Sequence, residues 1–263
     1  LPDQSFLTGV NSAYNFIDLD GSDQYISVQD DSSLTVSTAL SVSTWINHDS
    51  TGSLQAYVTN WDYPNAGRSY RLYYTSGLKI ELSTGGQSDT KNITASFTPV
   101  VGSWYHIAFT FDSGTVKAYI NGESQTVTAD AGMHTSLYSS NGVTLIGAVG
   151  NESTNTHHMN GKIGQTSIFN KVLSSTEVSA IYNLGRHGNL LDSYSDNLVG
   201  NWAMSSLDSV TGLSDSISTV YDRSGNSNHG TPQNADAGDL KSSPNAEPNG
   251  YSKGDTNRTT TTP

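Results

Sequence analysis

The sequence predicts an all-β fold: two antiparallel sheets packed as a jelly-roll sandwich, with one short helix and a C-terminal extension. Short runs of alternating apolar and polar residues recur from residue 19 onward, each closed by Gly, Asn, Asp or Ser, and the run through Leu78, Ile80 and Leu82 alternates most cleanly. Only 14% of residues are charged and 25 are glycine, which suits many turns better than long amphipathic helices.

Further strands are expected across the first two thirds of the chain, enough for two packed sheets. They fall at residues 24–28, 40–46, 54–61, 70–74, 104–111, 115–120 and 143–147. The Asn121-Gly122 pair lies between two such runs and predicts a β-hairpin, because both residues accept the positive φ of a type I′ turn.

One helix is expected after residue 174. Ser174 and Glu177 form the Ser-x-x-Glu pattern of a capping box, Val178 and Ile181 fall on one helical face, and Gly185 supplies a C-terminal stop. Composition changes after about residue 186, so residues 1–185 are predicted to form the sandwich. Residues 186–263 are predicted to form an extension with a small β element and a low-complexity tail, extended or partner-bound from Asp239 on.

Charge and composition exclude several classes of protein. The formal net charge of −12 would repel phosphate backbones, so nucleic acid is not expected as a partner. The absence of cysteine excludes disulfides, a thiol nucleophile and cysteine-ligated zinc. No apolar run reaches the roughly 20 residues that a membrane-spanning helix needs, so no membrane span is expected.

Three blocks carry a resemblance: residues 19–28 with 40–46, residues 102–112 running into 119–122, and residues 160–174 with the helix. In this order they resemble the laminin-G-like group of the concanavalin A-like lectin/glucanase superfamily. They cover about residues 14–185, and the Trp104-Tyr105-His106 strand running into the Asn121-Gly122 turn is the most specific of them. The resemblance implies a concanavalin A-like jelly roll.

A second resemblance concerns the order of motifs. An Asp-x-Ser-Gly-Asn block, residues 221–230, follows the helix here, with residues 197–202 before it, an order similar to virion-associated proteins of tailed phages. It implies a virion-surface or extracellular location, an oligomer, and contact with a virion structural protein through residues 186–263.

Catalysis is not expected. Glycosidases need two carboxylates flanking the scissile bond, and those of this superfamily carry them in a Glu-x-Asp-x-x-Glu type of run, which the chain lacks. Its glutamates are scattered. Adjacent His157 and His158 could be metal ligands, but on a strand they would point to opposite faces, so a polar loop is favoured. His106 is expected as a hydrogen-bonded core residue.

The family resemblance also implies a calcium site near the opening strand and near an aspartate of the closing strand. Gln165 stands at that aspartate position, which removes one carboxylate. Asp20 and Asp23 are the remaining candidate calcium ligands; the alternative is that they only form a turn.

The candidate ligand-binding segment is a loop over residues 60–70, which combines aromatic rings, amides and an arginine. Such side chains pack on sugar rings and bind hydroxyls, but they also anchor protein interfaces or support a loop. The leading interpretation is a non-catalytic module that binds glycans, such as a host-surface polysaccharide, or a partner protein. The alternatives are a capsid decoration or fibre protein without sugar binding, and a polysaccharide-degrading enzyme. The candidate residues are Asn60, Trp61, Asp62, Tyr63, Asn65, Arg68 and Tyr70.

Overall fold

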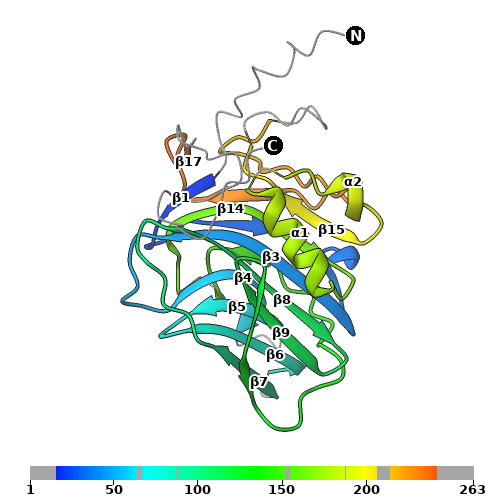
Figure 1. The fold of residues 1–263 in the computed structure, drawn as a ribbon. Coiled ribbons are helices and arrows are strands. Elements are labelled where there is room, and N and C mark those ends of the chain that lie inside the picture. The colour runs from blue at the N-terminus through cyan, green and yellow to red at the C-terminus, as the bar shows by residue number, and fades with distance from the viewer. Residues whose placement is uncertain are drawn as a thin grey trace, which may run out of the picture.

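Two sheets packed face to face form the body of the chain (Figure 1). The computed structural model describes residues 16–63, 67–87, 89–151, 155–186, 188–205 and 214–241. Sheet A has eight strands in the order β10-β9-β8-β3-β14-β1-β17, with β15 also paired to β14. Sheet B has nine strands in the order β11-β7-β6-β5-β4-β12-β2-β16, with β13 also paired to β4. The predicted all-β sandwich is confirmed.

The strands of sheet A are β1 (Phe16–Asp20), β3 (Ala39–His48), β8 (Trp104–Asp112), β9 (Thr115–Ile120), β10 (Glu123–Gln125), β14 (Asn160–Phe169), β15 (Leu198–Trp202) and β17 (Leu240–Lys241). Those of sheet B are β2 (Tyr25–Val28), β4 (Gln55–Tyr63), β5 (Gly67–Tyr74), β6 (Leu78–Gly86), β7 (Thr90–Ala95), β11 (Val127–Ala129), β12 (Thr144–Ile146), β13 (Gly150–Asn151) and β16 (Gly230–Gln233). Among the described strands, β13 pairs with β4 in parallel and the other pairings are antiparallel.

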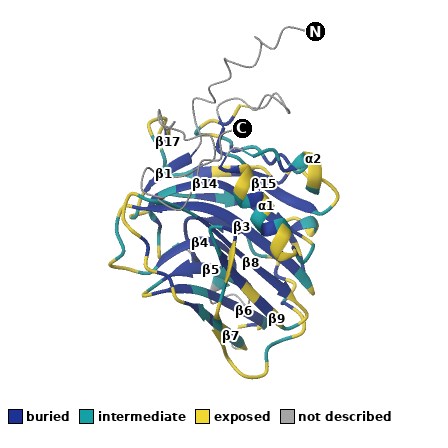
Figure 2. Cartoon of the chain, viewed as in Figure 1, coloured by how far each residue is buried: buried dark blue, intermediate teal, exposed yellow. Residues whose placement is uncertain are grey.

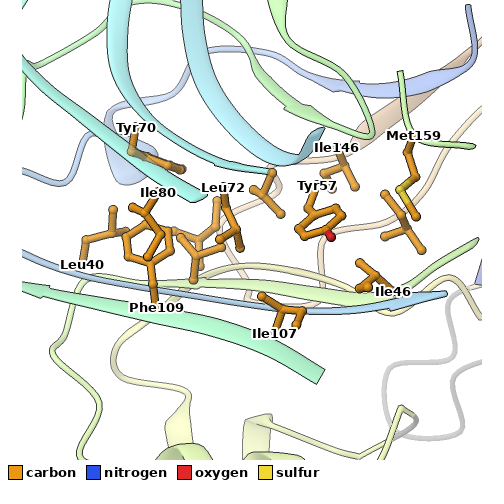
Figure 3. Close-up of a cluster of buried hydrophobic side chains, with 14 of the residues drawn as sticks. Leu40, Ile46, Tyr57, Tyr70, Leu72, Ile80, Ile107, Phe109, Ile146 and Met159 are labelled. Atoms are coloured by element: carbon orange, nitrogen blue, oxygen red, sulfur yellow. The ribbon is translucent and has the colours of Figure 1, made fainter. Parts of the chain in front are cut away.

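The main core lies between the sheets (Figure 3). Leu78, Ile80 and Leu82 point into it and are at most 1% exposed, whereas Lys79 and Glu81 lie on the other face of β6, as the alternation predicted. Each fully buried side chain of this size contributes roughly 1.5–3 kcal/mol of transfer free energy. Burial of the inward-facing residues therefore stabilises the packing of the two sheets.

The Asn121-Gly122 hairpin forms as predicted, between β9 and β10. Asn121 has φ 52° and Gly122 has φ 78°, the left-handed values that a type I′ turn requires. The chain then leaves sheet A after Gln125 and enters sheet B as β11, so this hairpin also carries it across the sandwich.

The outer face of sheet A is covered. Helix α1 (Ser175–Leu184) has the predicted capping box, with the Ser174 and Glu177 side chains each accepting from the other residue's backbone N–H. A second apolar cluster joins the helix to β8, β9 and β14, and a four-residue helix, α2 (Leu191–Tyr194), follows it. Figure 2 shows buried residues beneath α1 and exposed residues on its outer side.

His106 is a core residue, as predicted. It is fully buried, its Nε2 lies 2.8 Å from Ser43 Oγ, and its ring packs against Trp45. Burial lowers the pKa of His106 to about 3, because a charged imidazole would lose its hydration there. The histidine is therefore neutral at physiological pH.

The region after residue 186 adds strands to both sheets. β15 pairs with β14, β17 with β1, and β16 with β2. The predicted small β element is therefore built into the sandwich by backbone hydrogen bonds. The domain boundary at residue 185 stays a prediction, and residues 242–263 of the predicted tail lie outside the described residues.

The Asp-x-Ser-Gly-Asn block is an internal clamp. The Asp222 carboxylate accepts from the backbone N–H groups of Asn201 at 2.8 Å and Asn228 at 3.0 Å. The Asn228 side chain donates to Val199 O at 2.8 Å, and its backbone carbonyl accepts from Trp202 Nε1 at 2.8 Å. These bonds join β15 to the segment before β16, which explains the residue types of the motif without a ligand.

Candidate functional site

The candidate segment 60–70 is a β-hairpin built from β4 and β5, where a loop was expected. This separates the predicted residues, because alternate strand positions face opposite sides of a sheet. Tyr70 is 1% exposed and points into the core beside Phe109 (Figure 3). Asn60 is also buried and donates to Gly142 O at 3.1 Å. Neither side chain is placed to touch a ligand on the outer face.

Trp61 and Arg68 do reach the outer face of sheet B, where both line a pocket of about 350 Å³. Asp62 is half-buried beside them on β4 and does not line the pocket. Asn65 and the side chain of Tyr63 lie outside the described residues. The remaining lining residues are Arg71, Glu81, Val149, Gly150, Thr156 and His157.

An ion pair forms one wall of the pocket. Arg71 and Glu81 lie directly opposite each other on β5 and β6, and Arg71 Nε donates to Glu81 Oε2 at 2.7 Å. The Arg71 guanidinium also lies 4.9 Å from the Trp61 ring centroid and 4.6 Å from that of Tyr73. Cation–π contact and the carboxylate therefore hold this guanidinium in one orientation.

Val149, Gly150, Thr156 and His157 form the opposite wall. β13 runs parallel to β4, and a Cβ at Gly150 would come within 2.6 Å of the Trp61 carbonyl oxygen. Glycine therefore permits the close approach of this segment to β4. The segment returns through Thr156, which bridges to Val149 and brings His157 to the pocket.

His157 is exposed at the pocket rim, and its Nδ1 lies 2.9 Å from Thr156 Oγ1. Partial burial, followed by the positive charge of Arg71, lowers the pKa of His157. The pocket thus presents an aromatic ring, an ion-paired guanidinium and carboxylate, a hydroxyl and a neutral imidazole. Such a set can pack on an apolar ring face while exchanging hydrogen bonds with hydroxyl groups.

Sequence reasoning missed Arg71 and Glu81 and assigned His157 to a polar loop. The alternation Tyr70-Arg71-Leu72 was a usable signal, since it places Arg71 on the face opposite two core residues. The role of His157 had no local signal, because its carbonyl oxygen accepts from the Ala56 N–H of β4 at 2.9 Å, a contact between residues far apart in the sequence.

The pocket lining contains one carboxylate, that of Glu81, and it is held by Arg71. Glycoside hydrolysis usually uses a second carboxylate across the scissile bond, and none of the described lining residues supplies one.

The candidate calcium ligands Asp20 and Asp23 lie exposed at the end of β1 and in the turn that follows it. Asp20 Oδ1 accepts from the backbone N–H of Ser22 at 2.8 Å, which is a turn contact. Gln165 donates to Gly188 O at 3.0 Å. Within the described ranges, no group of three or more His, Cys, Asp or Glu side chains is arranged to hold a metal ion, so these residues do not fit the calcium cage that the resemblance implies.

No helix in the described part of the chain is both long and apolar enough to cross a membrane. No curated protein sequence matches the chain significantly.

Comparison with solved structures confirms the fold. A protein from Bacteroides ovatus that has been proposed to bind carbohydrate aligns with a TM-score of 0.58 and 16% identity, over 84% of this chain and 58% of its own. The chain thus spans less than two thirds of that protein. The CBM40 module of the Ruminococcus gnavus IT-sialidase, bound to α2,6-sialyllactose, aligns with a TM-score of 0.50 and 16% identity, over 63% of this chain and 97% of its own.

The model of one family, described as the concanavalin A-like lectin/glucanases superfamily, matches residues 20–179, more than half of the chain. That range runs from β2 through β14 to the first half of α1, and every described lining residue of the pocket falls within it. The chain belongs to the concanavalin A-like lectin/glucanases superfamily.

Proposed function

We propose that the chain is a non-catalytic glycan-binding module whose ligand site is the pocket at Trp61, Arg71, Glu81 and His157. The observation that carries this proposal is the pairing of Arg71 with Glu81 beside two aromatic rings. Together they offer a donor and an acceptor, both charge-assisted, at one ring-sized site, which suits adjacent sugar hydroxyls. The carbohydrate-binding descriptions of the two structural neighbours are consistent with this choice.

The test is binding of the purified chain to a broad glycan array. Arg71→Gln and Glu81→Gln each remove a charge but keep a polar side chain of similar size. Loss of one charged hydrogen bond costs about 1.5–3 kcal/mol, so each variant should bind roughly 10- to 100-fold more weakly. A parallel array with a calcium chelator should give unchanged binding, since the described residues offer no calcium cage.

Thr231→Ala is the matched control. Thr231 lies exposed on β16, opposite Ser27 at the other edge of sheet B. This variant should bind like the parent chain, and thermal melts of all variants should report intact folding. No saturable binding by the folded parent chain to any glycan would overturn the proposal.

Display on a virion surface is a separate proposal, which rests on the order of the sequence motifs. Because the backbones of β15, β16 and β17 pair within the sheets, contact with a virion structural protein would use exposed side chains of residues 186–241 or residues 242–263. Mass spectrometry of purified phage particles would test this display. An oligomer of the free chain, which is expected if it decorates a particle, would be tested by analytical ultracentrifugation.

A further inference from the structure

One wall of the pocket is anchored to β4 by backbone hydrogen bonds. The Ala56 N–H donates to His157 O at 2.9 Å, and Tyr57 O accepts from the Gly147 N–H at 2.9 Å. Gly147 O accepts in turn from the Met159 N–H at 2.8 Å. Because His157 and the residues that follow Gly147 line the pocket, these bonds set how closely the wall lies to β4.

Both anchor residues of β4 lie at a β-bulge. Ala56 pairs with Tyr73 and Val58 pairs with Leu72, so Tyr57 is an extra residue on β4. Tyr57 and Val58 both belong to the main core, although successive residues of a regular strand face opposite sides. Ala56 remains on the outer face, in an apolar cluster that includes two pocket residues. The bulge therefore determines which backbone groups of β4 meet the pocket wall.

The Tyr57 side chain is held by His48. Both are fully buried, and Figure 3 shows the Tyr57 ring among apolar side chains of the core. Tyr57 Oη lies 2.7 Å from His48 Nε2, and His48 Nδ1 lies 3.1 Å from Ser50 O. Burial lowers the pKa of His48, so its ring is neutral near pH 7. A carbonyl oxygen can only accept, so Nδ1 carries the proton and Nε2 accepts from the tyrosine O–H.

A second proton on the His48 ring would break this arrangement. Nε2 would become a donor facing the hydroxyl that donates to it, and the O–H would need another acceptor inside the core. Asp49 favours the proton, and Lys162, which lies 2.7 Å from the Asp49 carboxylate, offsets part of that charge. The phenols of Tyr57 and Tyr74 also pack against the ring, and they carry no charge in acid.

We propose that Tyr57 and His48 are positioning residues of the pocket: their hydrogen bond fixes the bulge, the bulge fixes the wall that carries His157, and acid loosens that wall. Neither side chain lines the pocket, so both act through the backbone of β4. This inference rests on the proposed glycan-binding function and adds a buried, proton-sensitive control of the same site.

The first test is amide hydrogen exchange, followed by NMR on the whole chain at pH 7. Tyr57→Phe removes the hydroxyl and keeps the ring. The Ala56 and Gly147 amides should exchange about 2- to 10-fold faster, the factor that corresponds to one lost hydrogen bond. Amides of the β9–β10 hairpin, at the far edge of sheet A, should keep the parent rates because they open independently.

Tyr74→Phe is the matched control. The Tyr74 ring lies 5.0 Å from that of His48, but the ring nitrogens of His48 bond to Ser50 and Tyr57 instead. This variant should exchange like the parent chain. On the glycan array, Tyr57→Phe should bind about 2- to 10-fold more weakly than the parent, whereas Tyr74→Phe should bind equally well.

His48→Gln tests the role of the proton. Glutamine offers a donor to Ser50 O and an acceptor to the Tyr57 hydroxyl, but it does not titrate. In the parent chain the protection of the Ala56 amide should fall as the pH is lowered from 7 to 4.5. In His48→Gln this protection should change much less over the same range.

The outcomes separate this inference from the proposed function. Parent-like exchange of the Ala56 and Gly147 amides in Tyr57→Phe, or an equal change in Tyr74→Phe, would overturn it. Faster exchange in Tyr57→Phe together with unchanged glycan affinity would overturn it as well, because the wall would then not control the pocket. If exchange responds as expected but the parent chain binds no glycan, the proposed function fails while the link from His48 to the wall stands.

Discussion

Two arginine–carboxylate pairs lie in different parts of the sandwich and differ in how far solvent reaches them. Arg223 and Asp215 have side-chain exposures of 1% and 0%, and each of two guanidinium nitrogens lies 3.1 Å from a separate carboxylate oxygen. Arg71 and Glu81 have exposures of 18% and 10%, and two Arg71 nitrogens share the single oxygen Glu81 Oε2.

The surroundings explain the difference. Asp215 also accepts from the backbone N–H groups of Ser205 at 2.7 Å and Tyr221 at 2.8 Å, so four N–H donors surround it, as a buried carboxylate requires. Burial raises the pKa of Asp215, and Arg223 opposes that rise. The Arg71–Glu81 pair instead faces a pocket. The same pair of residue types is thus sealed from solvent in one place and lines a pocket in the other.

Removing each arginine should give the largest difference in stability between the two pairs. Arg223→Met leaves a buried carboxylate without its counter-charge, so the free energy of unfolding should fall by about 3–5 kcal/mol. Arg71→Met removes a partly hydrated pair and should cost about 1 kcal/mol. Urea unfolding followed by circular dichroism measures both. Equal losses of unfolding free energy would mean that the difference in burial does not make the two ion pairs differ in their contribution to stability.

Buried histidines should make the free energy of unfolding depend on pH. The pKa of His106 is about 3 in the folded chain, against about 6.5 in an unfolded chain, so the unfolded state binds the extra proton first. The resulting stability is complete above pH 6.5 and is lost as pH falls toward 3, by about 4–5 kcal/mol in all. Burial lowers the pKa of His48 as well, which acts in the same direction.

Urea unfolding at pH 4.5, 5.5 and 7 measures this loss. His106→Gln has no group that titrates in this range at that position, so its free energy of unfolding should depend less steeply on pH than that of the parent. His157→Gln at the pocket rim is the comparison variant: the lowered pKa of His157 acts in the same direction, but this side chain is exposed, so its removal should change the slope much less than His106→Gln does. An unchanged slope in His106→Gln would exclude His106 as a source of the acid sensitivity.

Local sequence patterns were sufficient for much of the fold. The turn at Asn121-Gly122, the cap at Ser174 and the alternation along β6 each depend on neighbours within a few residues, and all three form as predicted. The pairing of β16 with β2 and of β17 with β1 joins segments from opposite ends of the chain. No local pattern specifies such pairings, which is why this region was predicted as an extension.

The site was predictable only in part, because a change of register lies within it. The pairing of β4 with β5 shifts between Asn60 and Trp61; such a bulge alters which face the following residues occupy. The extra residue is Ser69 on β5, so Arg68 joins Trp61 at the pocket although Tyr70, two positions further on, faces the core. In the sequence, residues 60–70 form one segment rich in aromatic residues. Nothing local indicates which of them face the core and which face the pocket.

Replacing each arginine by lysine should give smaller effects that still differ between the two pairs. Lysine keeps the positive charge but cannot form the paired donor geometry of a guanidinium. Arg223→Lys should lose one of two hydrogen bonds to charged groups, costing about 1.5–3 kcal/mol of unfolding free energy. Arg71→Lys should change stability by less than about 1 kcal/mol and should chiefly weaken glycan binding. The same urea series, with the array as second readout, separates the two effects.

The smallest expected effect concerns the charge that Arg71 projects into the pocket. Burial is the main cause of the lowered pKa of His157, and the positive charge of Arg71 contributes to it. Arg71→Gln should therefore raise the pKa of His157 without bringing it fully to the ordinary value, as measured by NMR titration of the imidazole protons. Arg223→Lys, which changes no charge, should leave that pKa where it is. If Arg71→Gln also leaves it unchanged, the guanidinium does not act on His157 in solution, and the pocket must be more open to water than the contacts among Trp61, Arg71 and Glu81 indicate.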